Sequence, residues 1–262
     1  MGLYIKIPNV TFKNYIGIAE IEDEPIIPDV PDVPDEPTIT DTYPVTDTLK
    51  GLFYLGGNPT DSLFNHAVED GGTAEIPSTA SVDFSNANYA TFSGDMKASR
   101  ITTRVITAAP ESGVTMVALF RVPTGNRSIV SAYQTSANKG FVFGNERCYA
   151  HAGSGGQRHY DTAVNSDNFA ICAFYAGPNG LRVVKSGNDG AVSKIYQLND
   201  ALTAWTASGG ITIGGGQTNV SFNDTADIAL VSIHEGEVGE ELLQDIFAHI
   251  RWYADSKGLT IE

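Results

Sequence analysis

Apolar and polar residues alternate in short stretches along most of the chain from about Leu49 onward. In residues 113–123 the apolar residues at every second position would share one face of a strand, and they are Val114, Met116, Ala118, Phe120 and Val122. Similar stretches follow at 128–133, 139–145, 169–177, 180–187, 209–216 and 226–236, separated by Gly, Asn, Ser and Pro. A period of two with frequent turns predicts an all-β fold, an antiparallel sandwich of two sheets.

The period changes to that of a helix near the C-terminus, in residues 239–259. Its apolar stripe has helical spacing and consists of Leu243, Ile246, Phe247, Ile250 and Tyr253. Glu240 and Glu241 suit the first turn of a helix, and Lys257 with Gly258 suits the last. We expect this helix to cap an edge or an end of the sandwich, with Trp252, like Trp205 elsewhere, as a packing residue.

The N-terminal residues 1–24 also alternate, first through Leu3, Ile5 and Ile7 and again through Ile16 and Ile18. Two strands of this size cannot bury a core of their own, and an isolated hairpin is marginally stable in water. We therefore expect this segment to become ordered against another chain. The alternative is a frayed tail or an extra edge strand on the body.

Residues 25–48 form an acidic spacer with a proline at every third position from Pro25 to Pro37. This spacing matches the three-residue turn of polyproline II, which rises about 3.1 Å per residue. Residues 20–48 contain ten acidic residues and no Lys or Arg, so like charges extend the chain further. The sequence thus predicts three parts: anchoring strands at 1–24, a semi-rigid acidic linker at 25–48 and a β-sandwich at 49–262.

Composition narrows the possible partners. The net charge is −15, but the body from Leu49 onward carries only 21 acidic against 14 basic residues. Nucleic acid and anionic lipid both require clustered Lys and Arg, so neither is expected as a partner. No apolar run approaches the roughly 20 residues of a membrane helix, and no signal peptide is visible. Two cysteines, Cys148 and Cys172, are too few for a disulfide framework and are expected to be free thiols.

Two resemblances follow from these stretches. Residues 114–123, 168–190 and 209–258 together resemble the concanavalin A-like, laminin-G-type jelly roll, which implies a lectin-like sandwich with a terminal helix. Residues 5–21 resemble the leader I-x-x-A-x-F-S-x-N-x-I-G of bacteriophage tail and appendage proteins. The residues that carry this second resemblance are Asn9, Phe12, Asn14, Ile16 and Gly17, while Lys13 stands where the pattern has a small polar residue.

Leader, spacer and sandwich together resemble a bacteriophage virion appendage, a tail fibre or receptor-binding protein. This implies a protein on the virion surface, assembled in the host cytoplasm, that contacts other virion proteins, forms a homo-oligomer such as a trimer and adheres to a host-surface glycan. The implied virion-anchor residues are Ile5, Ile7, Val10, Phe12, Ile16, Gly17 and Ile18. The alternatives are a capsid decoration or head-fibre protein of the same architecture, a glycan-active hydrolase and a bacterial adhesin module.

The sequence offers no catalytic constellation. A glucanase with this fold needs two carboxylates about 5 Å apart, spaced E-x-D-x-E on one strand. The nearest approach, "EIEDE" at Glu20–Glu24, has the wrong order and lies beside the prolines, so we interpret it as a solvated charge run. Neither H-E-x-x-H nor G-x-S-x-G occurs. We therefore predict a protein without enzymatic activity and without catalytic residues.

No cofactor or metal is predicted. "GNDG" from Gly187 and "FNDTAD" from Phe222 offer oxygens that suit Ca²⁺, but Asn and Asp are also the ordinary residues of tight turns, which is the interpretation we favour.

The best candidate for a binding surface is the glycine-rich segment 148–162. Aromatic rings and planar polar side chains are the groups that recognise sugars. The segment concentrates such residues, and the predicted carbohydrate-binding set is Tyr149, His151, Gln157, Arg158, His159 and Tyr160. The alternative is an ordinary hairpin with its aromatic residues in the core.

Overall fold

A computed structural model describes residues 42–68, 72–77, 81–134, 139–151, 157–161, 166–187, 192–198, 202, 205, 207, 209–216 and 224–262. The predicted virion anchor, with all seven of its residues, and most of the predicted linker lie outside the described residues. The described residues make up the predicted sandwich together with the last residues of the linker.

The larger of two sheets has eight strands in the described part. Their order is β12, β11, β10, β5, β14, β3 and β2, and β1 also pairs with β14. All of these pairings are antiparallel. The strands are β1 (Leu49–Tyr54), β2 (Val82–Asp83), β3 (Ala90–Phe92), β5 (Val114–Val122), β10 (Ser166–Gly177), β11 (Gly180–Ser186), β12 (Val192–Leu198) and β14 (Ala226–Glu235).

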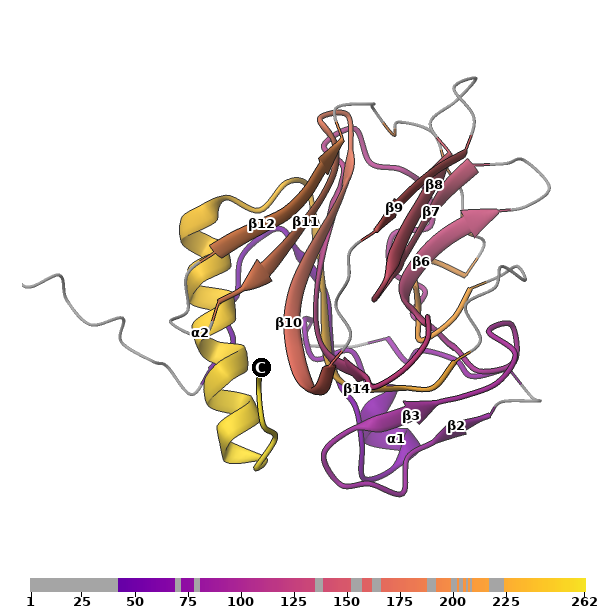
Figure 1. The fold of residues 1–262 in the computed structure, drawn as a ribbon, viewed down its shortest axis with the longest axis vertical. Coiled ribbons are helices and arrows are strands. Elements are labelled where there is room, and N and C mark those ends of the chain that lie inside the picture. Colours follow the sequence, from indigo (N-terminus) through magenta and orange to yellow (C-terminus); the bar gives the residue numbers. More distant parts are fainter. Residues whose placement is uncertain are drawn as a thin grey trace, which may run out of the picture. The chain divides into compact units, whose positions relative to one another are not determined.

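The smaller sheet has six strands in the order β4, β13, β6, β7, β8 and β9, again antiparallel. These strands are β4 (Ile101–Thr102), β6 (Ser128–Gln134), β7 (Lys139–Gly144), β8 (Arg147–His151), β9 (Gln157–Asp161) and β13 (Thr212–Ile213). The two sheets face each other across the main core (Figure 1). The predicted antiparallel two-sheet sandwich of the jelly-roll kind is therefore confirmed.

Strand β5 lies between β10 and β14 and is buried on both faces. Met116 and Phe120 belong to the core between the sheets. Val117 and Leu119 belong to a second apolar cluster on the outer face of the larger sheet. Since both faces are covered, the segment is apolar at nearly every position and not only at alternating ones.

Helix α2 (Glu240–Ser256) covers this outer face (Figure 1). The predicted apolar stripe is confirmed, because Leu243, Ile246, Phe247, Ile250 and Tyr253 are all buried. The predicted position of the helix at an edge or end of the sandwich is wrong. Val117 and Leu119 of β5, together with residues of β10 and β14, provide an apolar surface that is removed from water only if the helix lies across the sheet. A shorter helix, α1 (Pro59–Ser62), follows its N-cap Asn58.

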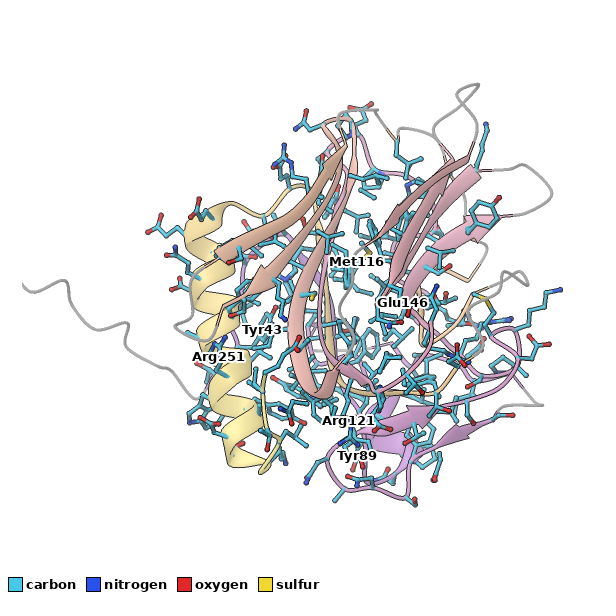
Figure 2. All side chains as sticks on the ribbon, in the orientation of Figure 1. Tyr43, Tyr89, Met116, Arg121, Glu146 and Arg251 are labelled. Carbon is cyan, nitrogen blue, oxygen red and sulfur yellow. The ribbon has the colours of Figure 1, made fainter. Side chains whose placement is uncertain are left out.

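Tyr43 connects the last part of the predicted linker to the sandwich. Its side chain lies between α2 and the larger sheet and is only 5% exposed (Figure 2). The hydroxyl donates to Ser232 Oγ at 2.6 Å and lies 3.1 Å from His234 Nε2, and the ring meets that of His249 edge-on. The packed body therefore includes residue 43, ahead of Leu49.

Cys148 and Cys172 are free, as predicted, and both are buried in the core between the sheets. No helix in the described ranges is both long and apolar enough to cross a membrane.

Candidate functional site

The residues predicted to bind carbohydrate fall on the hairpin of β8 and β9, at one edge of the smaller sheet. The structure describes the backbone of Tyr149, His151, Gln157, Arg158, His159 and Tyr160, whereas their side chains lie outside the described part. Backbone pairing still decides which positions share a face, because residues i and i+2 of a strand lie on the same face.

Cross-strand pairing groups four of these positions on the outer face. Tyr149 and His151 alternate in β8 with Cys148 and Ala150, which are buried in the core. Tyr149 pairs with His159, and the neighbouring pair is formed by positions 151 and 157. These four positions therefore form a compact block of two adjacent pairs on the side of the sheet away from the core.

Arg158 and Tyr160 occupy the intervening register positions. They pair with Ala150 and Cys148, respectively, both of which are buried. The register thus divides the predicted set of six between the two faces of the hairpin.

The outer row that contains Tyr149 continues across the smaller sheet. Tyr149 pairs with Val142, Val142 with Ser131, and Ser131 with Thr212. These three partners are buried, and Val142 packs with Met96 and Tyr133. The centre of the outer face is therefore covered.

Arg127 fastens the loops beside this sheet. Its guanidinium is fully buried and donates to four carbonyl oxygens, those of Gly94 at 2.6 Å, Gly214 at 2.7 Å, Ser99 at 2.8 Å and Asp224 at 3.2 Å. Burial lowers the pKa of Arg127 to about 10, so the group stays charged at neutral pH. The cation therefore ties the β3–β4 connection and the β13–β14 connection to the start of β6. Sequence reasoning missed it, since nothing beside position 127 indicates distant partners.

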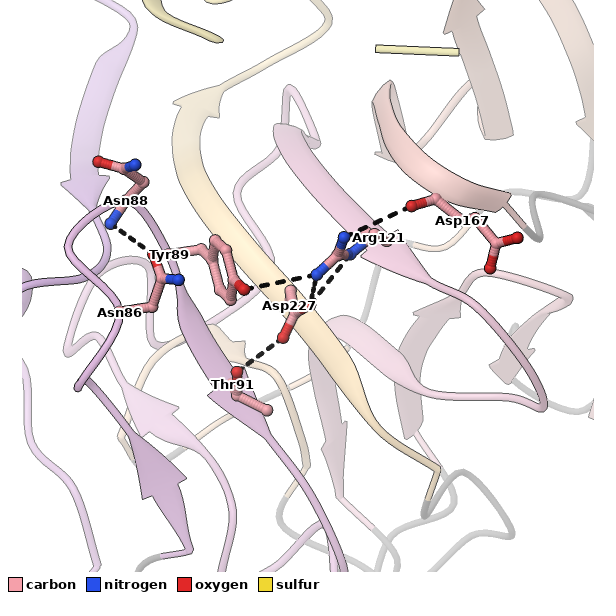
Figure 3. A network of polar contacts seen from close by, with 7 residues as sticks. All are labelled: Asn86, Asn88, Tyr89, Thr91, Arg121, Asp167 and Asp227. Carbon is pink, nitrogen blue, oxygen red and sulfur yellow. Dashed lines mark hydrogen bonds and ion pairs between the residues drawn. The ribbon is translucent and has the colours of Figure 1, made fainter. Parts of the chain in front are cut away.

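A second arginine organises the outer face of the larger sheet (Figure 3). Arg121 of β5 donates to the carboxylate of Asp227 on β14 through Nε, at 3.0 Å, and also through Nη2. Thr91 Oγ1 donates to the other carboxylate oxygen at 2.6 Å. The guanidinium carbon lies 5.5 Å from the ring centroid of Tyr89 and 5.1 Å from that of Phe169. Both oxygens of Asp227 are thus engaged in a contact that joins β3, β5 and β14.

These contacts bear on the suggested calcium ligands. In "FNDTAD", Asp224 accepts a hydrogen bond from the Asn126 amide at 2.7 Å, and Asp227 is held by Arg121. Residues 222–223, and residues 188–190 of "GNDG", lie outside the described residues. Within the described ranges, no group of three or more His, Cys, Asp or Glu side chains is placed to hold a metal ion.

The two tryptophans differ in how far their side chains are buried. Trp205 is buried and meets Phe141 edge-on, so its predicted packing role is confirmed. Trp252 is 36% exposed and therefore is not a core residue, although its ring packs against the buried ring of His249. It lies two positions after Ile250 of the apolar stripe, which on a helix points it well away from the buried face.

Cavities open on the described surface, and two of them are large enough to concern ligand binding. One, of about 480 Å³, is lined by Thr73, Glu75 and Arg104, and the last two form an exposed ion pair. The other, of about 710 Å³, lies where α2 meets the C-terminal tail and is lined by Trp252, Asp255 and Thr260 among others.

The architecture is an antiparallel sandwich of two β-sheets, and comparison with known proteins agrees. No family model matches the chain, and no curated protein matches it. Among solved structures, the binding domain of Paraclostridial Mosquitocidal Protein 1 has a TM-score of 0.56 at 13% identity, covering 78% of this chain and 52% of that chain. The ligand-binding domain of botulinum neurotoxin serotype D, in complex with N-acetylneuraminic acid, has a TM-score of 0.53 at 10% identity, covering 77% and 50%.

A sialidase from Trypanosoma rangeli has a TM-score of 0.52 at 12% identity, and the match covers 79% of this chain but 33% of the sialidase. At such identities the likeness is one of fold. This chain spans about half the length of the two binding domains.

Proposed function

We propose that the chain is a non-enzymatic glycan-binding module of a bacteriophage virion appendage, a tail fibre or receptor-binding protein docked to the particle by its N-terminal segment. In this proposal the outer face of the β8–β9 hairpin contacts a host-surface glycan. The observation that carries the proposal is the register that puts Tyr149 beside His159 and His151 beside Gln157 on one face.

Physical chemistry supports this choice of surface. Aromatic rings stack on the apolar face of a sugar, and planar amide and imidazole groups reach its hydroxyls. The centre of the same sheet face is covered around Val142, so a ligand on this face would have to bind at an edge of the sheet, and the hairpin forms one such edge. Two solved structures with the same fold are described as binding domains, one of them bound to N-acetylneuraminic acid.

The virion part of the proposal rests on the sequence. Residues 1–24 alternate like strands that lack a core, and the acidic, proline-punctuated linker would hold the sandwich away from the docking point. Several copies, as in a trimer, would let a weak saccharide site bind a repetitive surface with high avidity. A capsid decoration or head-fibre protein shares this layout, and imaging labelled N-termini on particles distinguishes the two.

The glycan surface can be tested with an array of bacterial O-antigens, capsular polysaccharides and teichoic acids. The double substitution Tyr149→Ala and His159→Ala should reduce binding at least about tenfold while leaving the melting temperature near that of the wild type. Lys139→Ala, at an exposed position at the start of β7, is the matched control and should bind normally. Wild-type binding that survives the double substitution would refute the site.

Particle docking can be tested separately by deleting residues 1–24. We expect a folded body that no longer enters particles, because in this proposal the anchor contacts other virion proteins rather than the sandwich. Unfolding of the truncated body would contradict this division of the chain.

The fold likeness to a sialidase keeps a hydrolase as the second candidate. Incubating the bound polysaccharides with the protein distinguishes the two, since hydrolysis releases new reducing ends or free sialic acid. Our proposal expects neither.

A further inference from the structure

The cavity at the end of α2 is formed by a sharply terminated helix. Gly258 follows the C-cap Lys257 in the left-handed conformation, with φ of 66°. The Leu259 amide donates to the Ala254 carbonyl at 2.9 Å, and the Gly258 amide donates to the Asp255 carbonyl at 3.0 Å. This is the Schellman arrangement, which turns the chain back across the end of the helix.

The C-terminal tail is then fixed against the larger sheet. The Phe169 amide of β10 donates to the Thr260 carbonyl at 2.8 Å, and the Glu262 amide donates to the Phe169 carbonyl at 2.9 Å. Lys185 of β11 forms an ion pair with Glu262. Helix end and tail therefore form a hollow of about 710 Å³ whose walls are held in place by backbone hydrogen bonds, a size typical of small-ligand sites.

The hollow displays an aromatic platform beside oxygen groups. Trp252 is the only tryptophan with an exposed ring, and it packs on the buried His249 ring with centroids 5.6 Å apart, which restrains it. Asp255, one turn further along α2, and Thr260 on the tail are both exposed and line the same hollow. An indole face next to a carboxylate and a hydroxyl matches the apolar face and hydroxyl edge of a sugar ring.

The charged side chains around the hollow limit the class of ligand that it can bind. Arg251 also lines the hollow, but its guanidinium donates to Ser186 Oγ at 2.8 Å and to the Gly187 carbonyl. Lys257 lies over the ring of Tyr253, 5.6 Å from its centroid. Both nearby cations keep their charge but are held by neutral partners within the chain, whereas the exposed carboxylate of Asp255 offers acceptor oxygens to hydroxyl groups and would lie unfavourably close to the negative charge of an acidic sugar or a phosphate.

We propose that this hollow, named here the Trp252 pocket, is a second saccharide site that takes a neutral hexose unit. The indole of Trp252 stacks on the ring of the sugar, and Asp255 accepts hydrogen bonds from two of its hydroxyls. The inference rests on the proposed function for the class of ligand, but its residues are separate from the β8–β9 hairpin.

Tryptophan fluorescence provides the first test, because the chain has two tryptophans and one of them is buried. Titration with maltose, lactose or N,N′-diacetylchitobiose at millimolar concentrations should shift the emission of the wild type. Trp252→Phe leaves Trp205 as the sole reporter and should show no shift. N-acetylneuraminic acid should bind at least about tenfold more weakly than the best neutral disaccharide. A wild type that responds to none of the neutral sugars would refute the pocket.

Calorimetry with the best disaccharide then tests the residues. Trp252→Ala should weaken binding at least about tenfold and Asp255→Asn about threefold to tenfold, while Lys257→Ala, on the same helix end, should leave it unchanged. Thermal unfolding checks that each variant is folded. Loss of array binding in the hairpin variant alone would keep the proposed function and reject the pocket. Loss of array binding in the Trp252 variant alone would keep the pocket and reject the hairpin as the proposed glycan surface.

Discussion

Replacing Arg127 by methionine removes a buried cation while keeping much of its volume. Methionine cannot donate hydrogen bonds, so four carbonyl oxygens lose their donor: those of Ser99 and Gly214 in buried hydrogen bonds, and those of Gly94 and Asp224 in partly buried ones. We expect the loops that carry these carbonyls to separate from the smaller sheet and the sandwich to lose stability.

The magnitude follows from the number and kind of bonds. A hydrogen bond to a charged group contributes about 1.5 kcal/mol net at the lower end of measured values. At this lower value, four such bonds contribute about 6 kcal/mol, which water entry and loop relaxation reduce. Desolvation already opposes the charge, as the pKa of about 10 for Arg127 indicates. We therefore expect a loss of about 3 to 5 kcal/mol, as for one partner removed from a buried charged cluster.

Thermal and urea unfolding followed by circular dichroism measure this loss. For a body of this size, it corresponds to a fall in Tm of about 10 °C. Arg127→Lys keeps the charge but cannot reach all four carbonyls, so it should fall between wild type and Arg127→Met. Arg104→Met, which removes an exposed ion pair with Glu75, is the control and should change stability by less than about 1 kcal/mol. Equal melting temperatures for Arg127→Met and Arg104→Met would refute the reasoning.

Three further predictions concern other parts of the sandwich. Burial lowers the pKa of His234 to about 4, below its ordinary value of 6.5, so the folded state binds fewer protons than the unfolded state between these pH values. The free energy of unfolding should fall by about 3 kcal/mol as the pH drops through that window, and urea unfolding at several pH values will measure it. The fall should be smaller in His234→Gln, in which Tyr43 and His249 still face position 234. Gly258→Ala should cost about 1 kcal/mol because of its positive φ, with Gly258→Asn costing less, which melting temperatures will compare. A chain beginning at residue 42 should melt several degrees above one beginning at residue 49, because the shorter chain loses the buried Tyr43 ring; equal melting temperatures would contradict this.

The spacing of apolar residues predicted the strands and the helix well, because the residues on the buried face of a strand or a helix recur with the period of that element. The apolar stretch ending at Val122 is β5, and the stripe from Leu243 to Tyr253 is the buried face of α2. The position of α2 was missed, although a signal existed. Val117 and Leu119 make β5 apolar on its second face as well, and a strand with two apolar faces needs a cover on each.

The exposed position of Trp252 could also have been predicted from the helical period, since Trp252 lies outside the apolar stripe that this period defines. Arg127 could not. Its partners at Gly94, Ser99 and Gly214 come close only when the sheets assemble, and no local pattern distinguishes a buried arginine from an exposed one. The pairing of Tyr149 with His159 was accessible in principle, but it depends on a register that a glycine-rich turn leaves open in the sequence.

The two proposed saccharide surfaces lie on opposite sides of the molecule. The β8–β9 hairpin belongs to the smaller sheet, whereas the Trp252 pocket lies at the end of α2, beyond the larger sheet (Figure 1). Two stacked sheets, about 10 Å apart, separate them, and they share no residue. Free energies of binding lost at distant, independent sites add. A variant that combines Tyr149→Ala and His159→Ala with Trp252→Ala should therefore lose the sum of the two separate losses on a polysaccharide that engages both surfaces. A combined loss well short of that sum would mean that the two surfaces are energetically coupled, and the two sites would then have to be treated as one.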